Sequence, residues 1–155
     1  TAKTQMEPYM LSTKEYFRQY YDIENRFLEG KLSRFKAKTA LEGGVLVRYD
    51  VLQNKLEKEK PVNKMAAKRK EQILYTIKGF RQYVFYISRY WATEDRIFQA
   101  RAKKIEAIHK PYFDKLMTAF YKVRAPNKIM KKNSRLPATL RAGSKKKWWE
   151  LLSKT

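Results

Sequence analysis

Large apolar residues recur at helical spacing through the middle of the chain. From Asn63 onward, one face carries six of them between flanking lysines and arginines: Ile73, Ile77, Phe80, Val84, Ile87 and Trp91. Because an α-helix turns once in 3.6 residues, this spacing places all six on one face that must be buried. We therefore expect a long helix from Asn63. Thr93, followed by Glu94 and Asp95, is typical of a helix cap and predicts a break near Ala92, although one continuous helix to about Ile108 is an alternative.

The same periodicity occurs on both sides of this segment. Ser12-Thr13-Lys14-Glu15 is typical of a capping box, which predicts a helix over roughly 13–29 that Gly30 terminates. A weaker pattern covers 31–42 and stops at Gly43-Gly44, where we expect a turn. Val45 to Val47 could begin a strand, but the helical spacing that follows favours a helix ending before Pro61. Pro111 suits the first turn of a last helix, over 111–124.

The regular pattern ends near residue 125, and apolar residues are irregularly spaced afterwards. The sequence thus predicts an all-α protein. Its expected parts are an N-terminal extension at 1–11, a helical body at 12–125 with about four or five helices, one of them long, and an irregular basic arm at 126–155.

Positive charge increases along the chain. The formal net charge of the 155 residues is +21. Residues 1–61 carry 12 basic and 9 acidic side chains, residues 62–125 carry 15 and 5, and residues 126–155 carry 9 and 1, giving net charges of +3, +10 and +8. Such a surplus opposes compaction by self-repulsion, and a bound polyanion would relieve it.

The arm is the main candidate for polyanion binding, because a single acid, Glu150, opposes its cations. The expected phosphate-binding residues of the arm are Lys128, Lys131, Lys132, Arg135, Arg141, Lys145, Lys146 and Lys147. Trp148 and Trp149 could stack on unpaired bases. With Leu151 and Leu152, they could instead dock on a neighbouring protein, which is the interpretation we favour.

A second basic cluster opens the long helix, at Lys64, Lys68, Arg69 and Lys70. The helix dipole disfavours cations there, so a compensating group outside the helix is expected. Seven further cations accompany the apolar stripe often enough to line a helix flank and meet successive phosphates: Lys78, Arg81, Arg89, Arg96, Arg101, Lys103 and Lys104. For any single one of them, a solvated position is at least as plausible.

The residues do not suggest an enzyme. The chain has no cysteine, one histidine, and no Gly-rich phosphate loop, serine elbow or zinc-ligand spacing. We expect His109 to be a cap or surface residue near a helix end. Five tyrosines lie on or beside apolar stripes and should belong to the core or its rim: Tyr16, Tyr20, Tyr49, Tyr83 and Tyr112. We expect no cofactor, no metal site and no small-molecule substrate. The acidic pairs Asp22/Glu24, Glu57/Glu59 and Glu94/Asp95 lie near cations, which favours ion pairing or capping over metal binding.

These features predict a structural, non-catalytic, RNA-binding component of a large ribonucleoprotein, most specifically a mitochondrial ribosomal protein that contacts rRNA and neighbouring proteins. The mitochondrial location depends on the basic composition and on Thr1, which would fit a processed start; a cytoplasmic location is the alternative. No apolar run approaches the roughly 20 residues that span a bilayer. An accessory subunit of a mitochondrial inner-membrane complex, facing anionic lipid and partner subunits, is the main rival function, and a DNA-architectural protein is a third.

Overall fold

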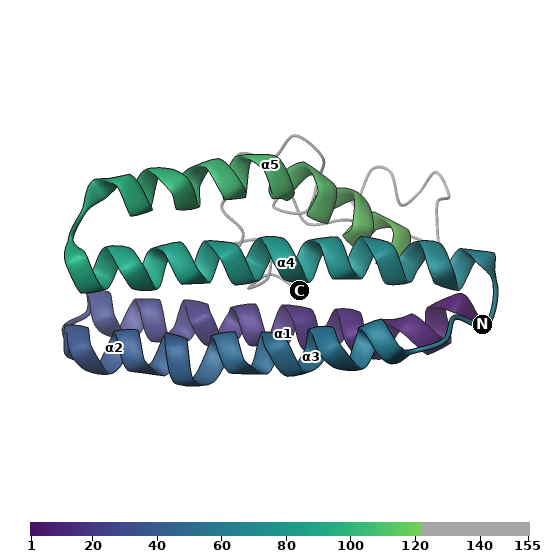
Figure 1. The fold of residues 1–155 in the computed structure, drawn as a ribbon, viewed down its shortest axis with the longest axis horizontal. Helices are drawn as coiled ribbons and strands as arrows, with labels where there is room; N and C mark the ends of the chain where they lie inside the picture. Colours follow the sequence, from purple (N-terminus) through teal and green to yellow (C-terminus); the bar gives the residue numbers. More distant parts are fainter. Residues whose placement is uncertain (122–155) are drawn as a thin grey trace, which may run out of the picture.

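The computed structural model describes residues 1–121, and these form an all-α fold (Figure 1). The elements are α1 (Ala2–Leu28), α2 (Arg34–Ala40), a π-helical turn η1 (Leu41–Val45), α3 (Leu46–Lys58), α4 (Lys64–Thr93) and α5 (Arg96–Tyr121). The predicted all-α class and helical body are confirmed. Three helices are long rather than the one expected, with 27 residues in α1, 30 in α4 and 26 in α5. The predicted arm lies outside the described residues.

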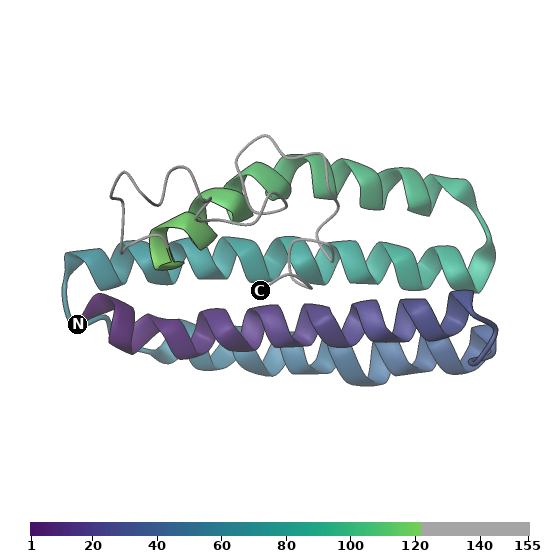
Figure 2. The same ribbon diagram turned by 180° about the vertical axis from the view of Figure 1, so that it is seen from behind.

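Helix α4 is the central element. It lies between α5 on one side and α1, α2 and α3 on the other, and α1, α3, α4 and α5 alternate in direction (Figures 1 and 2). All six residues of the predicted apolar stripe are buried. Helix α4 begins directly after Asn63, as the sequence predicts. Asn63 also caps it, because its side-chain oxygen accepts from the N–H of Ala66 at 2.8 Å.

Aromatic rings connect the helices across the core. The ring centroids of Phe17 in α1 and Phe80 in α4 are 4.4 Å apart, and Phe80 lies 5.2 Å from Phe113 in α5. Near the other end of α4, Trp91 lies 4.7 Å from Phe27 and 6.4 Å from Tyr20. Burial of such large rings is the main source of stability in a bundle of this kind.

The predicted helix start at Ser12 is wrong, because α1 begins at Ala2. Thr1 caps the helix, its hydroxyl accepting from the N–H of Thr4 at 3.1 Å. The helix also passes through Pro8, which removes one backbone hydrogen bond and normally costs about 3 kcal/mol in a helix interior. The first ten residues of α1 must therefore gain stability elsewhere.

Contacts with the α3–α4 connection provide that stability. The Gln5 amide donates to the Glu59 carboxylate at 2.8 Å and accepts from the N–H of Val62 at 2.9 Å. Tyr9 donates to the same carboxylate at 2.6 Å. Met6 and Met10 are fully buried on the adjoining face. The first turns of α1 are thus held by residues some fifty positions away in the sequence.

The predicted turn at Gly43-Gly44 is also wrong. Both glycines lie in η1, which joins α2 to α3 without a reversal of the chain. Neither has a positive φ, so neither uses the backbone freedom that favours glycine in turns. The π-turn accommodates one extra residue in the helical ladder, and Leu41 and Val45 at its two ends are buried. The segment from Arg34 to Lys58 is therefore one interrupted helix.

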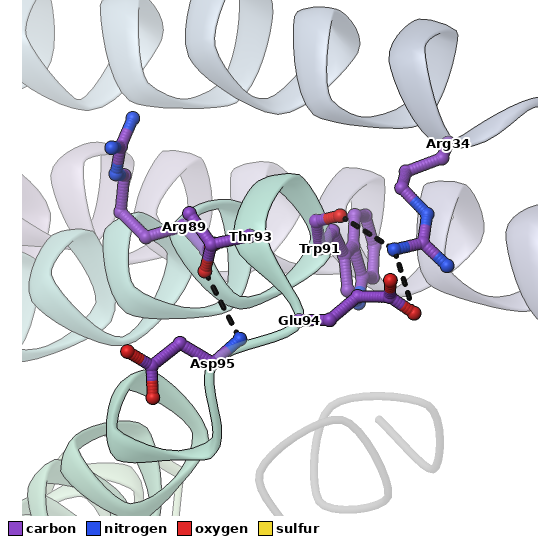
Figure 3. Close-up of polar contacts among 6 residues, drawn as sticks. All are labelled: Arg34, Arg89, Trp91, Thr93, Glu94 and Asp95. Atoms are coloured by element: carbon purple, nitrogen blue, oxygen red, sulfur yellow. Dashed lines mark hydrogen bonds and ion pairs between the residues drawn. The ribbon is translucent and has the colours of Figure 1, made fainter.

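The predicted break after α4 is confirmed, one to two residues beyond Ala92. Glu94 adopts a left-handed conformation, with φ 62°, and Arg34 pairs with its carboxylate at 3.0 Å and donates to the Trp91 carbonyl at 3.3 Å (Figure 3). Asp95 donates its N–H to the Thr93 hydroxyl and caps α5 by accepting from Ile97 at 3.0 Å. Glu94 and Asp95 thus pair and cap, as expected of this acidic pair. The cap expected at Thr93 is wrong, because Thr93 is the last residue of α4 and Asp95 caps the next helix.

Pro111 does not begin a helix. It lies inside α5, which changes direction in its second half (Figure 1). A proline in a helix interior removes a hydrogen bond and bends the helix. The helix continues through it because residues on both sides, His109 and Phe113, are buried. In this half of the helix, Leu116 and Phe120 are buried and Tyr112 is half-buried.

Candidate nucleic-acid interface

The four cations predicted at the start of α4 divide into two pairs. Lys64 and Lys68 are exposed, whereas Arg69 and Lys70 are half-buried. The Lys70 ammonium donates to the carbonyls of Glu57 at 2.9 Å and Glu59 at 2.8 Å, at the C-terminal end of α3. Cations are favoured at helix C-termini, so this contact supplies the compensating interaction that the sequence led us to expect. Lys70 therefore has a structural role in the free protein.

Arg69 is occupied as well, because its guanidinium donates to the side-chain oxygen of Gln72 at 2.7 Å. Lys64 and Lys68 form no ion pair within residues 1–121 and point outward from α4. These two are the members of the predicted cluster that remain available to a polyanion.

The solvent-facing side of α4 carries a repeating pattern opposite the buried stripe. Its residues follow two interleaved seven-residue spacings, and all are exposed except Arg89, which is half-buried. We call this surface the outer stripe; it comprises Lys64, Lys68, Glu71, Tyr75, Lys78, Gln82, Phe85 and Arg89. It contains four cations, one acid and two aromatic rings. At 1.5 Å per residue, it extends for about 37 Å along the helix.

The two aromatic members of the outer stripe are held differently. Tyr75 is 40% exposed, and its ring lies 4.4 Å from His109 and 4.5 Å from Tyr112 of α5. Phe85 is also 40% exposed, and its ring meets Tyr86 edge-on at 5.6 Å. Each ring therefore contacts another aromatic side chain while part of its surface faces solvent.

The remaining cations of the predicted flank are distributed over several surfaces. Arg81 pairs with Asp50 of α3. Arg101 lies over the rings of Phe98 and Tyr86, at 5.7 and 6.0 Å from their centroids. The other cations of α5 in this group are exposed: Arg96, Lys103 and Lys104. Lys78 and Arg89 alone join Lys64 and Lys68 on the outer stripe.

The tyrosines expected in the core or rim are found there. Tyr20, Tyr49 and Tyr83 are buried, and Tyr16 and Tyr112 are half-buried. The Tyr49 hydroxyl donates to the Thr13 carbonyl at 2.9 Å, and the Tyr20 hydroxyl donates to Glu24. Burial raises the pKa of all three buried phenols, so they remain neutral. These rings are packed inside the bundle and are not available for base stacking.

Two buried polar residues lie on α5. The expectation that His109 is a cap or surface residue is wrong, because only 8% of it is exposed and burial lowers its pKa. It packs directly on Gly79, where the missing side chain leaves room for the ring. Asp114 is 1% exposed, and its Oδ1 has no hydrogen-bond partner among residues 1–121. Burial raises its pKa to about 7. Sequence reasoning missed it, since a single aspartate between Phe113 and Lys115 gives no pattern.

The acidic residues in the described part of the chain do not gather around a common point. No group of three or more His, Asp or Glu side chains within residues 1–121 is placed to hold a metal ion. Glu59, from one of the predicted acidic pairs, accepts from Tyr9 and Gln5, and these hydrogen bonds lower its pKa. Across the same residues, no helix combines the length and apolar character needed to cross a membrane.

The candidate residues of the arm lie outside the described residues, so their predicted roles stay predictions. They are the eight cations Lys128, Lys131, Lys132, Arg135, Arg141, Lys145, Lys146 and Lys147, and the docking group Trp148, Trp149, Leu151 and Leu152. Comparison of the chain with protein families, curated proteins and solved structures gives no match.

Proposed function

We propose that this chain is a structural, non-catalytic, RNA-binding component of a large ribonucleoprotein, specifically a mitochondrial ribosomal protein that contacts rRNA. The observation that carries the proposal is the distribution of charge over the whole chain. Residues 1–121 carry 25 basic and 14 acidic side chains, and residues 122–155 carry 11 and 1. Both parts therefore carry a surplus of about ten positive charges. A polyanion that contacts both the helices and the arm would neutralise it.

The local chemistry of the helical part supports the same function. Lys64, Lys68 and Lys78 project from one exposed face of α4, and Arg96, Lys103 and Lys104 project from α5. Contacts from such side chains to backbone phosphates need no particular base sequence. A long bundle with an adjoining cationic arm suits a protein that docks on a particle and reaches into its RNA. The strongly basic composition is what favours a mitochondrial ribosome as the particle.

The salt dependence of RNA binding tests the mechanism. We expect the affinity of the full chain for structured RNA to fall steeply with salt concentration and to depend little on sequence, because release of counterions from phosphates drives the binding. A 1–125 truncation should show a shallower slope, since it lacks nine of the cations. An unchanged slope would mean that the arm is not the phosphate contact.

Sedimentation of the native protein tests the particle. We expect it to move with ribosomal subunits from mitochondria, and to be released when the rRNA is degraded by nuclease. Sedimentation with a detergent-solubilised membrane complex, insensitive to nuclease, would contradict the proposal.

One observation favours the rival function, an accessory subunit of an inner-membrane complex. Leu28 is 71% exposed and Phe35 is 72% exposed, and they flank the short connection between α1 and α2. Exposed Lys36 lies beside them. Apolar and cationic groups together at one end of a bundle could bind anionic lipid. In that case, binding to vesicles of anionic phospholipid should be lost on Leu28→Ser plus Phe35→Ser, and neutral vesicles should not bind.

A further inference from the structure

The outer stripe of α4 is a surface that the fold leaves open. The face of α4 opposite the outer stripe is buried against α1 and α3, and α5 packs along another side of the helix. Lys64, Lys68, Lys78 and Arg89 form no ion pair within residues 1–121, and Glu71 is the only acid among the eight positions. The bundle therefore presents a line of uncompensated cations along its longest helix.

Aromatic rings are interleaved with these cations. Tyr75 lies between Lys68 and Lys78, and Phe85 lies between Lys78 and Arg89. The two rings are ten residues apart, about 15 Å along the helix axis. Contacts of Tyr75 with Tyr112 and of Phe85 with Tyr86 restrict the two rings without burying them. A ring that is already ordered loses little entropy when a base stacks on it.

We propose that the outer stripe binds a single-stranded segment of RNA, with the cations on the phosphates and with Tyr75 and Phe85 stacked on unpaired bases. Cationic grooves with exposed rings are the recurring solution for single-strand binding. A duplex exposes its phosphates but keeps its bases stacked on one another, so it could bind the cations of this surface but could not stack its bases on the two rings. The inference rests on the RNA-binding function proposed above and assigns it a second contact, separate from the arm.

Two other occupants fit the surface less well. A partner helix would need apolar residues at most of the repeating positions, yet only Tyr75 and Phe85 of the eight qualify. A membrane surface would need an apolar helix face turned toward lipid, whereas the apolar stripe of α4 is buried in the bundle.

Charge-neutralised variants of the full chain test the proposal, with an unstructured oligouridine RNA and an RNA duplex of the same length as probes. The stripe variant replaces Lys64, Lys68, Lys78 and Arg89 with Gln. The control variant makes the same charge change elsewhere, at exposed cations of α1 and α3 that form no ion pair within residues 1–121: Lys3, Arg26, Lys55 and Lys58. Melting curves serve as the check that both variants fold, which we expect for substitutions at exposed helix positions.

We expect the stripe variant to bind oligouridine at least tenfold more weakly than the control variant. Its plot of log affinity against log salt should be shallower by up to about 3, because each phosphate that is no longer neutralised reduces the slope by about 0.7. Phe85→Ala should weaken oligouridine binding by about tenfold and leave duplex binding unchanged, because it removes a stacking partner. Leu11→Ala, which removes an apolar side chain of similar exposure from α1, should change neither.

The outcomes separate this inference from the proposed function. If the full chain binds RNA and the stripe and control variants behave alike, the inference is overturned while the proposed function stands. If Phe85→Ala affects neither probe, or the full chain prefers duplex, the assignment to single strands is wrong. If the full chain binds neither RNA at physiological salt, the proposed function fails, and this inference fails with it.

Discussion

The contact between Gly79 of α4 and His109 of α5 allows a sharp test of how closely these helices pack. A methyl group added at Gly79 would lie 2.5 Å from Cγ and 2.7 Å from Cε1 of the His109 ring, and closer still to Nδ1. Ordinary van der Waals contact is 3.4–4 Å, so the overlap is about 1 Å. The His109 ring also lies against Tyr75, with centroids 4.4 Å apart, which restricts its rotation. We therefore expect the Gly79→Ala substitution to displace α5.

Two opposing effects determine the magnitude. Alanine is favoured over glycine in a helix interior by about 1 kcal/mol. Overpacking of a tight contact costs about 1–3 kcal/mol, and displacement of the helix also weakens the packing around Phe113. We therefore expect Gly79→Ala to lower the free energy of unfolding by about 1–2 kcal/mol. In the double variant with His109→Ala the overlap is absent, so the second substitution should restore part of the stability.

Urea or thermal unfolding followed by circular dichroism measures these differences. The matched control is Gly43→Ala in η1, where an added methyl group meets nothing within 4 Å and φ is not positive. That substitution should raise stability by up to about 1 kcal/mol. If Gly79→Ala stabilises the protein as much as Gly43→Ala does, or if the two substitutions in the double variant are simply additive, the close approach of α4 and α5 is refuted.

Three further predictions follow from the described contacts. Because burial raises the pKa of Asp114 from its ordinary 3.8 to about 7, its contribution to stability should be most favourable below pH 4 and decline as pH rises towards 7; Asp114→Asn should remove that part of the pH dependence in urea titrations at several pH values. Glu94→Gly should be neutral or stabilising in thermal melts, because it relieves a left-handed φ and removes only an exposed ion pair with Arg34. A clear loss of stability would contradict this. Trp91→Ala should cost about 3–5 kcal/mol in the same melts, whereas replacing both tryptophans of the arm should leave the transition nearly unchanged; equal effects would contradict the arm model.

The sequence predicted the parts of the fold that local periodicity determines. The apolar stripe of α4, its start after Asn63 and the break near Ala92 depend on residues within a turn or two of each other, and all three are found. The start of α1 was missed because Gln5 and Tyr9 gain their partners from the α3–α4 connection, which no local pattern reveals. The turn predicted at the glycine pair, and the helix start predicted at Pro111, were wrong for a related reason. In both places, burial of the neighbouring residues stabilises the helix by more than the glycines or the proline destabilise it.

The candidate interface was predictable in part. Lys64 and Lys68 could be proposed from charge alone, and both are exposed. The role of Lys70 could not, because the carbonyls that it contacts belong to the end of another helix. The outer stripe was within reach of sequence reasoning, since its seven-residue spacing is as regular as that of the apolar stripe. To find it, the helical periodicity that identifies the apolar stripe must also be applied to the polar residues of α4.

The position of α5 implies that residues 1–121 need not unfold as one unit. Helix α4 packs against every other helix, whereas the extensive contacts of α5 within these residues are with α4 alone. Detachment of α5 would leave the packing of α1, α3 and α4 against one another in place. Native-state hydrogen exchange should therefore reveal two classes of amide, with those of α5 exchanging through a sub-global opening of lower free energy and those of α1, α3 and α4 through global unfolding. Helix α5 is thus expected to unfold separately from a core formed by α1, α3 and α4.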